Sequence, residues 1–280
     1  MNQQLKFLKE ELNTASGKMK ADMHIKNIRI LDVYTETIYP GSLVVKNGKI
    51  VASTPSWEVE AEQEYDGENM IAVPGFMDTH VHIETTLLTP EALSSVIVPW
   101  GTTTLFVDAM EIANVIGIKG LRALLNNNSD LPFRTFMEVP SRVPTAPGLE
   151  TTGGILGVAE VDELLNDDIA VSLGELDPEK VLNLKEEYLE KILCAKQKNM
   201  ICNGHAIGLN WDQLNVYSTA GLSDDHESVE YQELFERLRL GIKALVREGS
   251  TERNVDTLIK GVIKHNLPTE DLLFCTDDKH

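Results

Sequence analysis

The sequence predicts an α/β fold in which a small N-terminal β domain precedes a (β/α)8 barrel. Three observations support this prediction. Eight short β-like runs alternate with helical stretches after Val73, an Asn-Gly pair marks a hairpin near the N-terminus, and histidines and carboxylates fall at the ends of the later runs. With 280 residues, of which 42% are apolar and 25% charged, the chain can bury a sizeable core.

The N-terminal part begins with a helical pattern over residues 2–20, where leucines recur at helical spacing. From residue 23 to about residue 70, polar and apolar residues alternate, as they do in half-buried strands. Asn47 and Gly48 lie between two β-branched runs and predict a tight hairpin turn, because both turn residues need a positive φ. We therefore expect an antiparallel sheet here. The predicted parts are a helix over 1–22, a small β domain (a partial sandwich) over 23–72 and a barrel over 73–280.

The barrel prediction depends on eight short runs of β-forming residues. They are Gly75–His82, Thr102–Asp108, Phe133–Val139, Ala170–Leu176, Met200–Ala206, Gly221–Asp225, Ala244–Arg247 and Leu272–Asp277. Amphipathic segments of helical length lie between most of them, and Leu184–Lys198 and Ser228–Leu240 are clear examples. Strands that alternate with helices in this way are typical of parallel sheets and barrels.

The charge and the cysteines exclude several classes of function. The net charge of −19 repels phosphate backbones and anionic membranes, so we expect neither nucleic acid nor a membrane as partner. The chain has no apolar run that could span a bilayer and no signal-peptide core, which predicts a cytoplasmic location. Its three cysteines have no CxxC spacing, which disfavours both a disulfide framework and a cysteine-ligated zinc site.

Histidines and carboxylates mark the ends of the predicted barrel strands. His80 and His82 end the first strand, and alternate residues of a strand point the same way, so both imidazoles can bind one divalent metal. Taken alone, such a pair could equally be two surface histidines. The other strand ends carry further N and O ligands: Glu175, His205, His226 and Asp277. Because these ends converge at one face of a barrel, the sequence predicts a site for two Mn, Fe or Zn ions, with Glu175 able to bridge them.

The segments around these residues resemble the adenine deaminases of the amidohydrolase superfamily, whose fold is a TIM-type barrel. The resemblance runs from about residue 23 to the end. Its pieces are, in order, Pro74–Glu84, Gly101–Thr104, Glu111–Val115, Val139–Ser141, Gly174–Glu175, Gly204–Ala206, Asp225–Glu227, Arg247–Ser250 and Thr276–Asp278.

This resemblance implies a pair of Mn or Fe ions, with zinc as an alternative. His80 and His82 would bind one ion, His205 and His226 the other, and Glu175 would bridge them. Asp277 would ligate a metal and move protons. The implied reaction, part of purine salvage, is attack of a metal-activated hydroxide on C6 of adenine, which releases ammonia and leaves hypoxanthine. A different aminopurine or cyclic amide is the alternative substrate.

Roles are also predicted for four further residues. Glu111 is predicted to be catalytic through contact with the purine edge, and the alternative is an ordinary carboxylate at a helix N-terminus, which we favour for Glu84. Glu227 is expected to orient the imidazole of His226. Arg247 could form a surface pair with its neighbour in the chain.

The sequence departs from the family pattern at three places. Met110 stands where the family has a histidine, and Arg142 stands where it has a smaller residue.

The chain also stops at His280, three residues after Asp277, whereas family members are longer. We therefore expect the last barrel helix and the C-terminal region to be absent, leaving apolar surface on the eighth strand. Such a chain could be an inactive fragment or one half of a split enzyme. We expect it to have weak activity by itself, and a complementing C-terminal fragment to restore that activity. A second copy of the chain, in a homo-oligomer, is the other possible partner.

Overall fold

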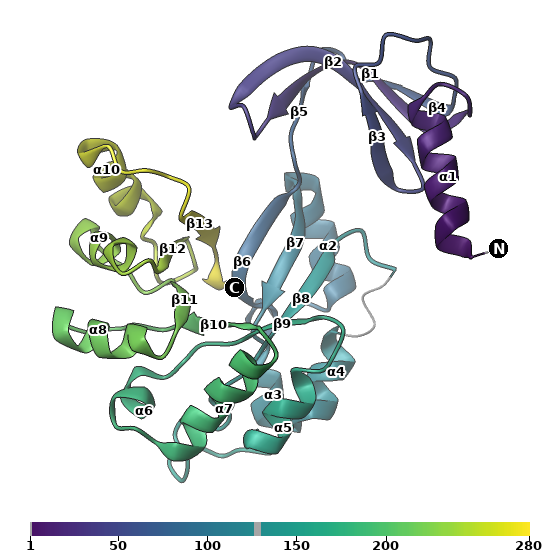
Figure 1. The fold of residues 1–280 in the computed structure, drawn as a ribbon. Helices are drawn as coiled ribbons and strands as arrows, with labels where there is room; N and C mark the ends of the chain where they lie inside the picture. Colours follow the sequence, from purple (N-terminus) through teal and green to yellow (C-terminus); the bar gives the residue numbers. More distant parts are fainter. Residues whose placement is uncertain (1, 126–129) are drawn as a thin grey trace. The chain divides into compact units, whose positions relative to one another are not determined.

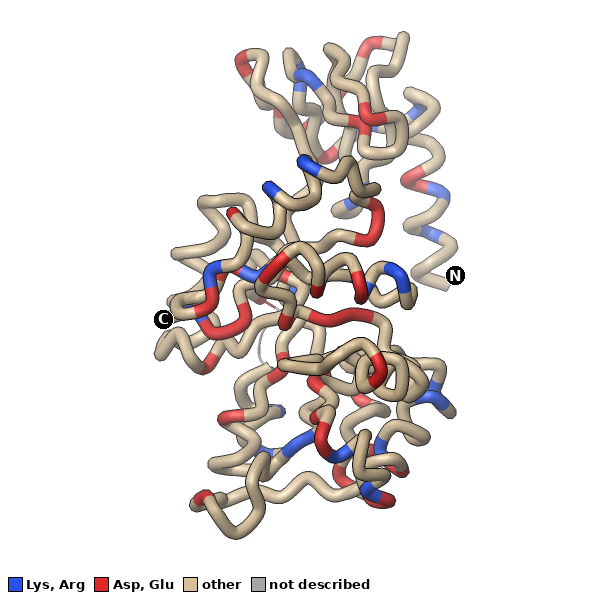
Figure 2. Tube along the Cα trace, turned by 90° about the vertical axis from the view of Figure 1, so that its left-hand side faces the viewer, with Lys and Arg blue, Asp and Glu red and all other residues tan. Residues whose placement is uncertain are grey.

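The computed structural model describes residues 2–125 and 130–280 (Figure 1). The chain divides into two compact units, one ending at Pro74 and the other beginning at Gly75. Acidic residues occur along the trace of both units (Figure 2), so the net charge of −19 is not confined to one of them. None of the helices in the described residues has the length and apolar character that a membrane span requires.

The first unit is a helix and a five-stranded sheet. Its elements are α1 (Gln3–Ala15), β1 (Ala21–Asp32), β2 (Thr37–Lys46), β3 (Lys49–Ser53), β4 (Ala61–Asp66) and β5 (Ile71–Ala72). The predicted turn is confirmed, because Asn47 and Gly48 join β2 to β3 with φ of 52° and 73°. Side chains of the hairpin hold α1, since Lys49 Nζ lies 3.1 Å from Glu11 Oε1.

The prediction of a wholly antiparallel sheet is wrong. The strand order is β3-β2-β1-β4, with β5 also paired to β1, and both β4 and β5 run parallel to β1. Alternation of polar and apolar residues reveals a half-buried strand but says nothing about its direction. Here residues 54–60 carry the chain back across the sheet before β4 begins, which makes the pairing parallel.

The second unit contains the predicted barrel of eight parallel strands. They are β6 (Phe76–His82), β7 (Thr102–Val107), β8 (Arg134–Val139), β9 (Ala170–Leu173), β10 (Ile201–Gly204), β11 (Leu222–Asp225), β12 (Lys243–Arg247) and an eighth strand in two pieces, β13 (Leu272–Cys275) and β14 (Asp277–Asp278). Each strand pairs with its neighbour in the chain, and β14 pairs with β6 to close the barrel, with Asp277 opposite Val81. Thr79 Oγ1 also donates to the carbonyl oxygen of Phe274 over 2.8 Å.

Helices follow the strands in the order that the sequence predicts (Figure 1). They are η1 (Ile83–Thr86), α2 (Pro90–Ile97), η2 (Val98–Trp100), α3 (Met110–Ile116), α4 (Ile118–Leu125), α5 (Val158–Leu164), α6 (Pro178–Leu182), α7 (Glu186–Gln197), α8 (Trp211–Thr219), α9 (Tyr231–Arg239) and α10 (Val255–His265). Helix α7 begins later than predicted, because Leu184 has φ of 53° and interrupts the helical path. On the eighth strand Phe274 is 54% exposed, in keeping with the expected apolar surface there.

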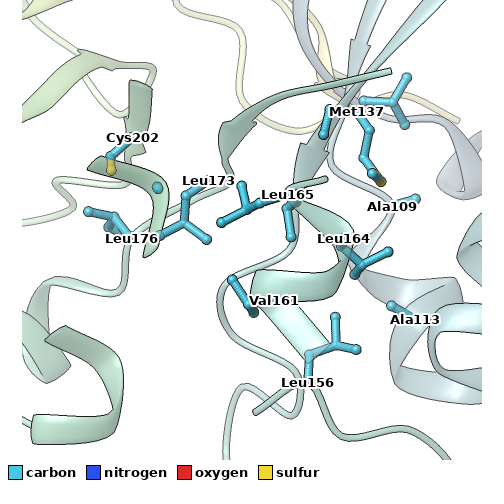
Figure 3. Close-up of a cluster of buried hydrophobic side chains, with 14 of the residues drawn as sticks. Ala109, Ala113, Met137, Leu156, Val161, Leu164, Leu165, Leu173, Leu176 and Cys202 are labelled. Carbon is cyan, nitrogen blue, oxygen red and sulfur yellow. The ribbon is translucent and has the colours of Figure 1, made fainter. Parts of the chain in front are cut away.

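The core lies between the strands and the helices outside them. Figure 3 shows part of one buried cluster that includes Met137 of β8, Leu173 of β9 and Val161 and Leu164 of α5, and all four side chains are fully buried. A smaller cluster joins β12 to α9 and α10. Burial of this kind stabilises the barrel by roughly 25 cal/mol per Å² of apolar surface removed from water. It also holds the strand ends in register.

One buried ion pair links α9 to β11. Arg237 Nε donates to Asp225 Oδ2 over 2.9 Å, and its Nη2 donates to the carbonyl oxygen of Ala206 over 2.7 Å. Both side chains of the pair are inaccessible, with exposed fractions of 1% and 0%. A buried charge that loses its partner is strongly destabilising.

We predict that Arg237→Met lowers the free energy of unfolding by about 3–5 kcal/mol, because it leaves Asp225 buried without its partner. Chemical denaturation followed by tryptophan fluorescence measures this loss. The matched control is Arg122→Met, whose guanidinium pairs with Asp167 at the surface and whose loss should cost about 0–1 kcal/mol. Equal losses for the two variants would contradict the prediction.

Candidate metal centre

The predicted site residues come together at the carboxyl ends of the barrel strands. His80 and His82 belong to β6, and Asp277 opens β14. Glu175 and His205 were predicted to close their strands, but β9 and β10 end at Leu173 and Gly204, so both residues lie just after their strands. His226 follows β11 directly. Because Glu175, His205 and His226 lie beyond the hydrogen-bonded strands, their backbone can turn the side chains toward the barrel axis.

Glu175 lies at the middle of this group and is 1% exposed. Its Oε1 lies 3.0 Å from His205 Nδ1, 3.0 Å from His226 Nε2 and 3.5 Å from His80 Nε2. Its Oε2 lies 3.7 Å from His82 Nε2. One carboxylate therefore faces all four histidines with its two oxygens.

Asp277 approaches the same imidazoles from the eighth strand. Its Oδ1 lies 3.3 Å from His82 Nε2 and 3.8 Å from His80 Nε2. Burial alone would raise the pKa of Asp277, but His82 and the other imidazoles outweigh it and hold that pKa well below its usual range. The carboxylate is therefore ionised, which suits both a metal ligand and a proton acceptor.

These residues fit a divalent metal. His80 Nε2, His205 Nδ1 and His226 Nε2 are buried and have no hydrogen-bond partner in the described ranges. A buried polar atom without a partner is costly, and a metal ion would supply the missing interaction. Two groups have ligand atoms within 4.8 Å of one another: His80, Glu175, His226 and Asp277, and His205, His226 and Glu227. Imidazole nitrogens and carboxylate oxygens are ligands for Mn, Fe or Zn.

The Nδ1 atoms of His80 and His82 each contact an oxygen of another residue. His80 Nδ1 lies 2.5 Å from Glu138 Oε2, and His82 Nδ1 lies 2.6 Å from the carbonyl oxygen of Asp108. Such partners fix the ring orientation and leave Nε2 free for a metal. The sequence analysis missed Glu138, although a charged residue at the inner end of the apolar strand β8 was a usable signal.

Asp108 is a second buried carboxyl group that the sequence analysis did not single out. It is 0% exposed, and neither side-chain oxygen has a hydrogen-bond partner within the described part of the chain. Burial raises the pKa of Asp108 well above its usual range, although nearby His82 opposes the shift. Gly174 permits this packing, because a Cβ there would lie 2.2 Å from Asp108 Oδ2.

The surface role considered for Arg247 is wrong. Arg247 is 3% exposed, and its Nη1 donates to Glu227 Oε1 over 2.9 Å and to Asp277 Oδ2 over 2.7 Å. Glu227 Oε1 lies 3.3 Å from both His205 Nδ1 and His226 Nε2, the atoms that also face Glu175. Burial would raise the pKa of Glu227, but His226, then His205 and Arg247, outweigh burial and lower this pKa to about 2. Glu227 thus faces the same nitrogens as Glu175, whereas a partner that orients His226 would contact Nδ1.

Glu84 is a helix N-terminal carboxylate, as expected, but it binds the N-terminus of α3, a helix farther along the chain. Its Oε1 accepts hydrogen bonds from the backbone N–H groups of Glu111 (3.1 Å) and Ile112 (3.2 Å), which begin α3. Burial, and then the charge of Glu111, raise the pKa of Glu84 to about 7. Glu111 Oε2 itself lies 3.4 Å from His82 Nδ1.

A cavity of about 490 Å³ opens onto these groups. Its lining includes His82, Glu175 and Asp277 from the strand ends, together with Met110 and Glu111 from α3. Pockets for small molecules fall in this size range. The structure therefore joins a small-molecule cavity to a cluster of metal-binding groups.

A family model described as the amidohydrolase family matches residues 71–271. The chain belongs to this family. The adenine deaminase of Desulforamulus reducens is 71% identical over 273 residues, and the match covers 98% of this chain and 46% of that protein. The adenine deaminase of Halalkalibacterium halodurans is 38% identical over 274 residues, with 98% and 46% covered. The predicted resemblance is confirmed, and the chain spans less than half the length of these relatives.

Solved structures share the fold of this amidohydrolase. Atrazine chlorohydrolase TrzN from Arthrobacter aurescens TC1, solved with zinc, superposes with a TM-score of 0.66 at 14% identity, covering 91% of this chain and 72% of that one. The β-aspartyl dipeptidase of Fervidobacterium islandicum AW-1 gives a TM-score of 0.58 at 15% identity, with 92% and 73% covered. At these identities the similarity concerns the fold alone.

We predict that Glu138→Gln weakens divalent metal binding by about 10- to 100-fold, because the carboxylate that orients His80 is lost while its shape is kept. Calorimetric titration of the metal-free chain measures the affinity. Glu163→Gln, which changes an exposed carboxylate on α5, is the control and should bind as the parent does. An unchanged affinity in Glu138→Gln would show that His80 does not need this partner.

Proposed function

We propose that this amidohydrolase hydrolyses adenine to hypoxanthine and ammonia at a centre of two divalent metals, Mn or Fe, with zinc as the alternative. The observation that carries the proposal is the set of buried imidazole nitrogens that converge on Glu175 and have no hydrogen-bond partner among the described residues. The substrate is suggested by the 71% identity to a protein named adenine deaminase. A role in purine salvage in the cytoplasm follows from that reaction.

The ligands divide around Glu175. His80 and His82 would hold one ion and His205 and His226 the other, with the two oxygens of Glu175 between them. A bound divalent metal would lower the pKa of water toward about 7. It would thereby supply a stronger nucleophile than neutral water. The remaining chemistry falls to the side chains of the chain itself.

Asp277 is placed to carry the proton. Hydrolysis forms a C6–O bond and breaks the bond between C6 and the amino nitrogen, and the nitrogen must be protonated to leave as ammonia. Arg247 holds Asp277 Oδ2, while Oδ1 faces the imidazoles at 3.3 Å or more. Oδ1 can therefore take the proton of the attacking water and pass it to the departing nitrogen.

Glu111 is proposed to bind the purine edge. Its side chain is 40% exposed and lines the cavity beside His82. The carboxylate can accept a hydrogen bond from a ring N–H of the base. This contact would orient C6 toward Asp277 and exclude bases that lack a donor at that edge.

The direct test is an ammonia-release assay with the metal-loaded 280-residue chain and adenine, with hypoxanthine identified by mass spectrometry. We expect adenine to react in preference to a panel of other aminopurines and cyclic amides. The Glu175→Gln variant, purified in the same way, controls for contaminating deaminase. Turnover of another panel member instead of adenine would overturn the substrate but not the class of reaction.

Glu175→Gln should lose metal and activity together, because the amide keeps the shape but removes the charge that balances two cations. Elemental analysis of the purified variant, with circular dichroism to confirm folding, measures the metal content. If Glu175→Gln binds two ions as well as the parent chain does, the bridging role is wrong.

Asp277→Asn should lower kcat by about 10²–10⁴-fold, the range expected when a general acid–base group is lost. The amide cannot accept and return the proton, although its oxygen can still face His82. Steady-state kinetics with adenine measure kcat. Nearly parental turnover by Asp277→Asn would assign proton transfer to another group.

A further inference from the structure

Arg142 contacts the oxygen of Glu175 that the histidines leave most open. Its Nη2 donates to Glu175 Oε2, whereas Oε1 faces His205 and His226 at 3.0 Å each. The imidazole facing Oε2 is His82, at 3.7 Å. The two oxygens of one buried carboxylate thus have different partners: Oε1 faces imidazoles alone, whereas Oε2 is bound by a guanidinium and faces His82 at a longer distance.

The backbone beside Arg142 is fixed on both sides. The buried Lys191 Nζ donates to the carbonyl oxygen of Ser141 over 3.1 Å, and the Leu156 N–H donates to the carbonyl oxygen of Val143 over 2.9 Å. Ser141 Oγ also donates to the carbonyl oxygen of Glu175 over 2.6 Å. The Cα of Arg142 is therefore anchored, and its long side chain is the part that can move.

The guanidinium group of Arg142 lies beside a second cavity. Arg142 Nε is buried without a hydrogen-bond partner among the described residues. The hydrogen-bond donors of the guanidinium are therefore only partly satisfied in its present position. Arg142 also lines a neighbouring cavity of about 540 Å³, whose lining residues include Asp177 and Glu179. Rotation of the side chain would exchange one carboxylate environment for another.

We propose that Arg142 makes the two metal positions unequal. The ion beside Glu175 Oε1 binds without hindrance, whereas the ion beside Oε2 binds only when the guanidinium withdraws, since two cations on one oxygen repel each other. This inference rests on the proposed binuclear centre. The chain then holds one divalent ion tightly and the second weakly, and Arg142 regulates the second ion as a positioning residue.

The test is a titration of the metal-free chain with Mn²⁺, followed by calorimetry and by the electron paramagnetic resonance of free and spin-coupled Mn²⁺. We expect two separated binding steps for the parent chain. In Arg142→Gln the second step should tighten by about 10- to 100-fold, the scale on which groups beside a ligand alter metal affinity. Arg142→Lys keeps the charge and should remain close to the parent. Arg122→Gln makes the same change at a partly exposed arginine on α4 and should not alter either step.

Each outcome bears on the proposal. An unchanged second step in Arg142→Gln overturns it, as do two equally tight steps in the parent chain, and both results leave the proposed reaction intact. Tightening in Arg122→Gln as well would also overturn it, because the effect would then be one of overall charge. Absence of metal binding in every folded variant would overturn the metal centre itself. If Arg142→Gln does not fold, Arg142→Met carries the same test.

Discussion

The buried negative charge of Glu175 is the constraint around which the barrel mouth is arranged. A carboxylate that is 1% exposed loses its hydration and must be compensated by donors or cations. His205 and His226 approach one of its oxygens and Arg142 the other. These groups come from different βα loops. The contacts that compensate the charge of Glu175 therefore connect the ends of several strands.

A layer of hydrogen bonds behind the site holds these groups in position. Ser141 Oγ and Tyr188 Oη donate to the carbonyl oxygen of Glu175 over 2.6 Å and 3.3 Å. Tyr217 Oη donates to the carbonyl oxygen of Leu176 and accepts from the His205 N–H over 3.0 Å. Because metal sites tolerate only small displacements of their ligands, such support matters as much as the ligands themselves.

The balance of charge in the centre explains why cations suit it. Glu175, Glu227 and Asp277 are carboxylates whose pKa values are held low, and Arg247 is shared between two of them. Against burial and the charge of His80, Glu175 and Glu227 raise the pKa of His226 to about 9. The centre therefore favours positive charge, which protons or metal ions can supply, and it keeps acceptors ionised for proton transfer.

The barrel and the strand-end positions of most candidate site residues could be predicted from the sequence, whereas the contacts among those side chains are set by the tertiary structure. Alternation of strands and helices, the Asn47–Gly48 turn and the placing of His80, His226 and Asp277 at strand ends are local patterns, readable because side-chain direction repeats along a strand. The contacts of Glu138, Glu227, Arg142 and Arg247, and the parallel pairing of β4 with β1, join segments far apart in the chain. Such contacts depend on strand register and on how closure of the barrel brings loops together, and neither leaves a local signal in the sequence.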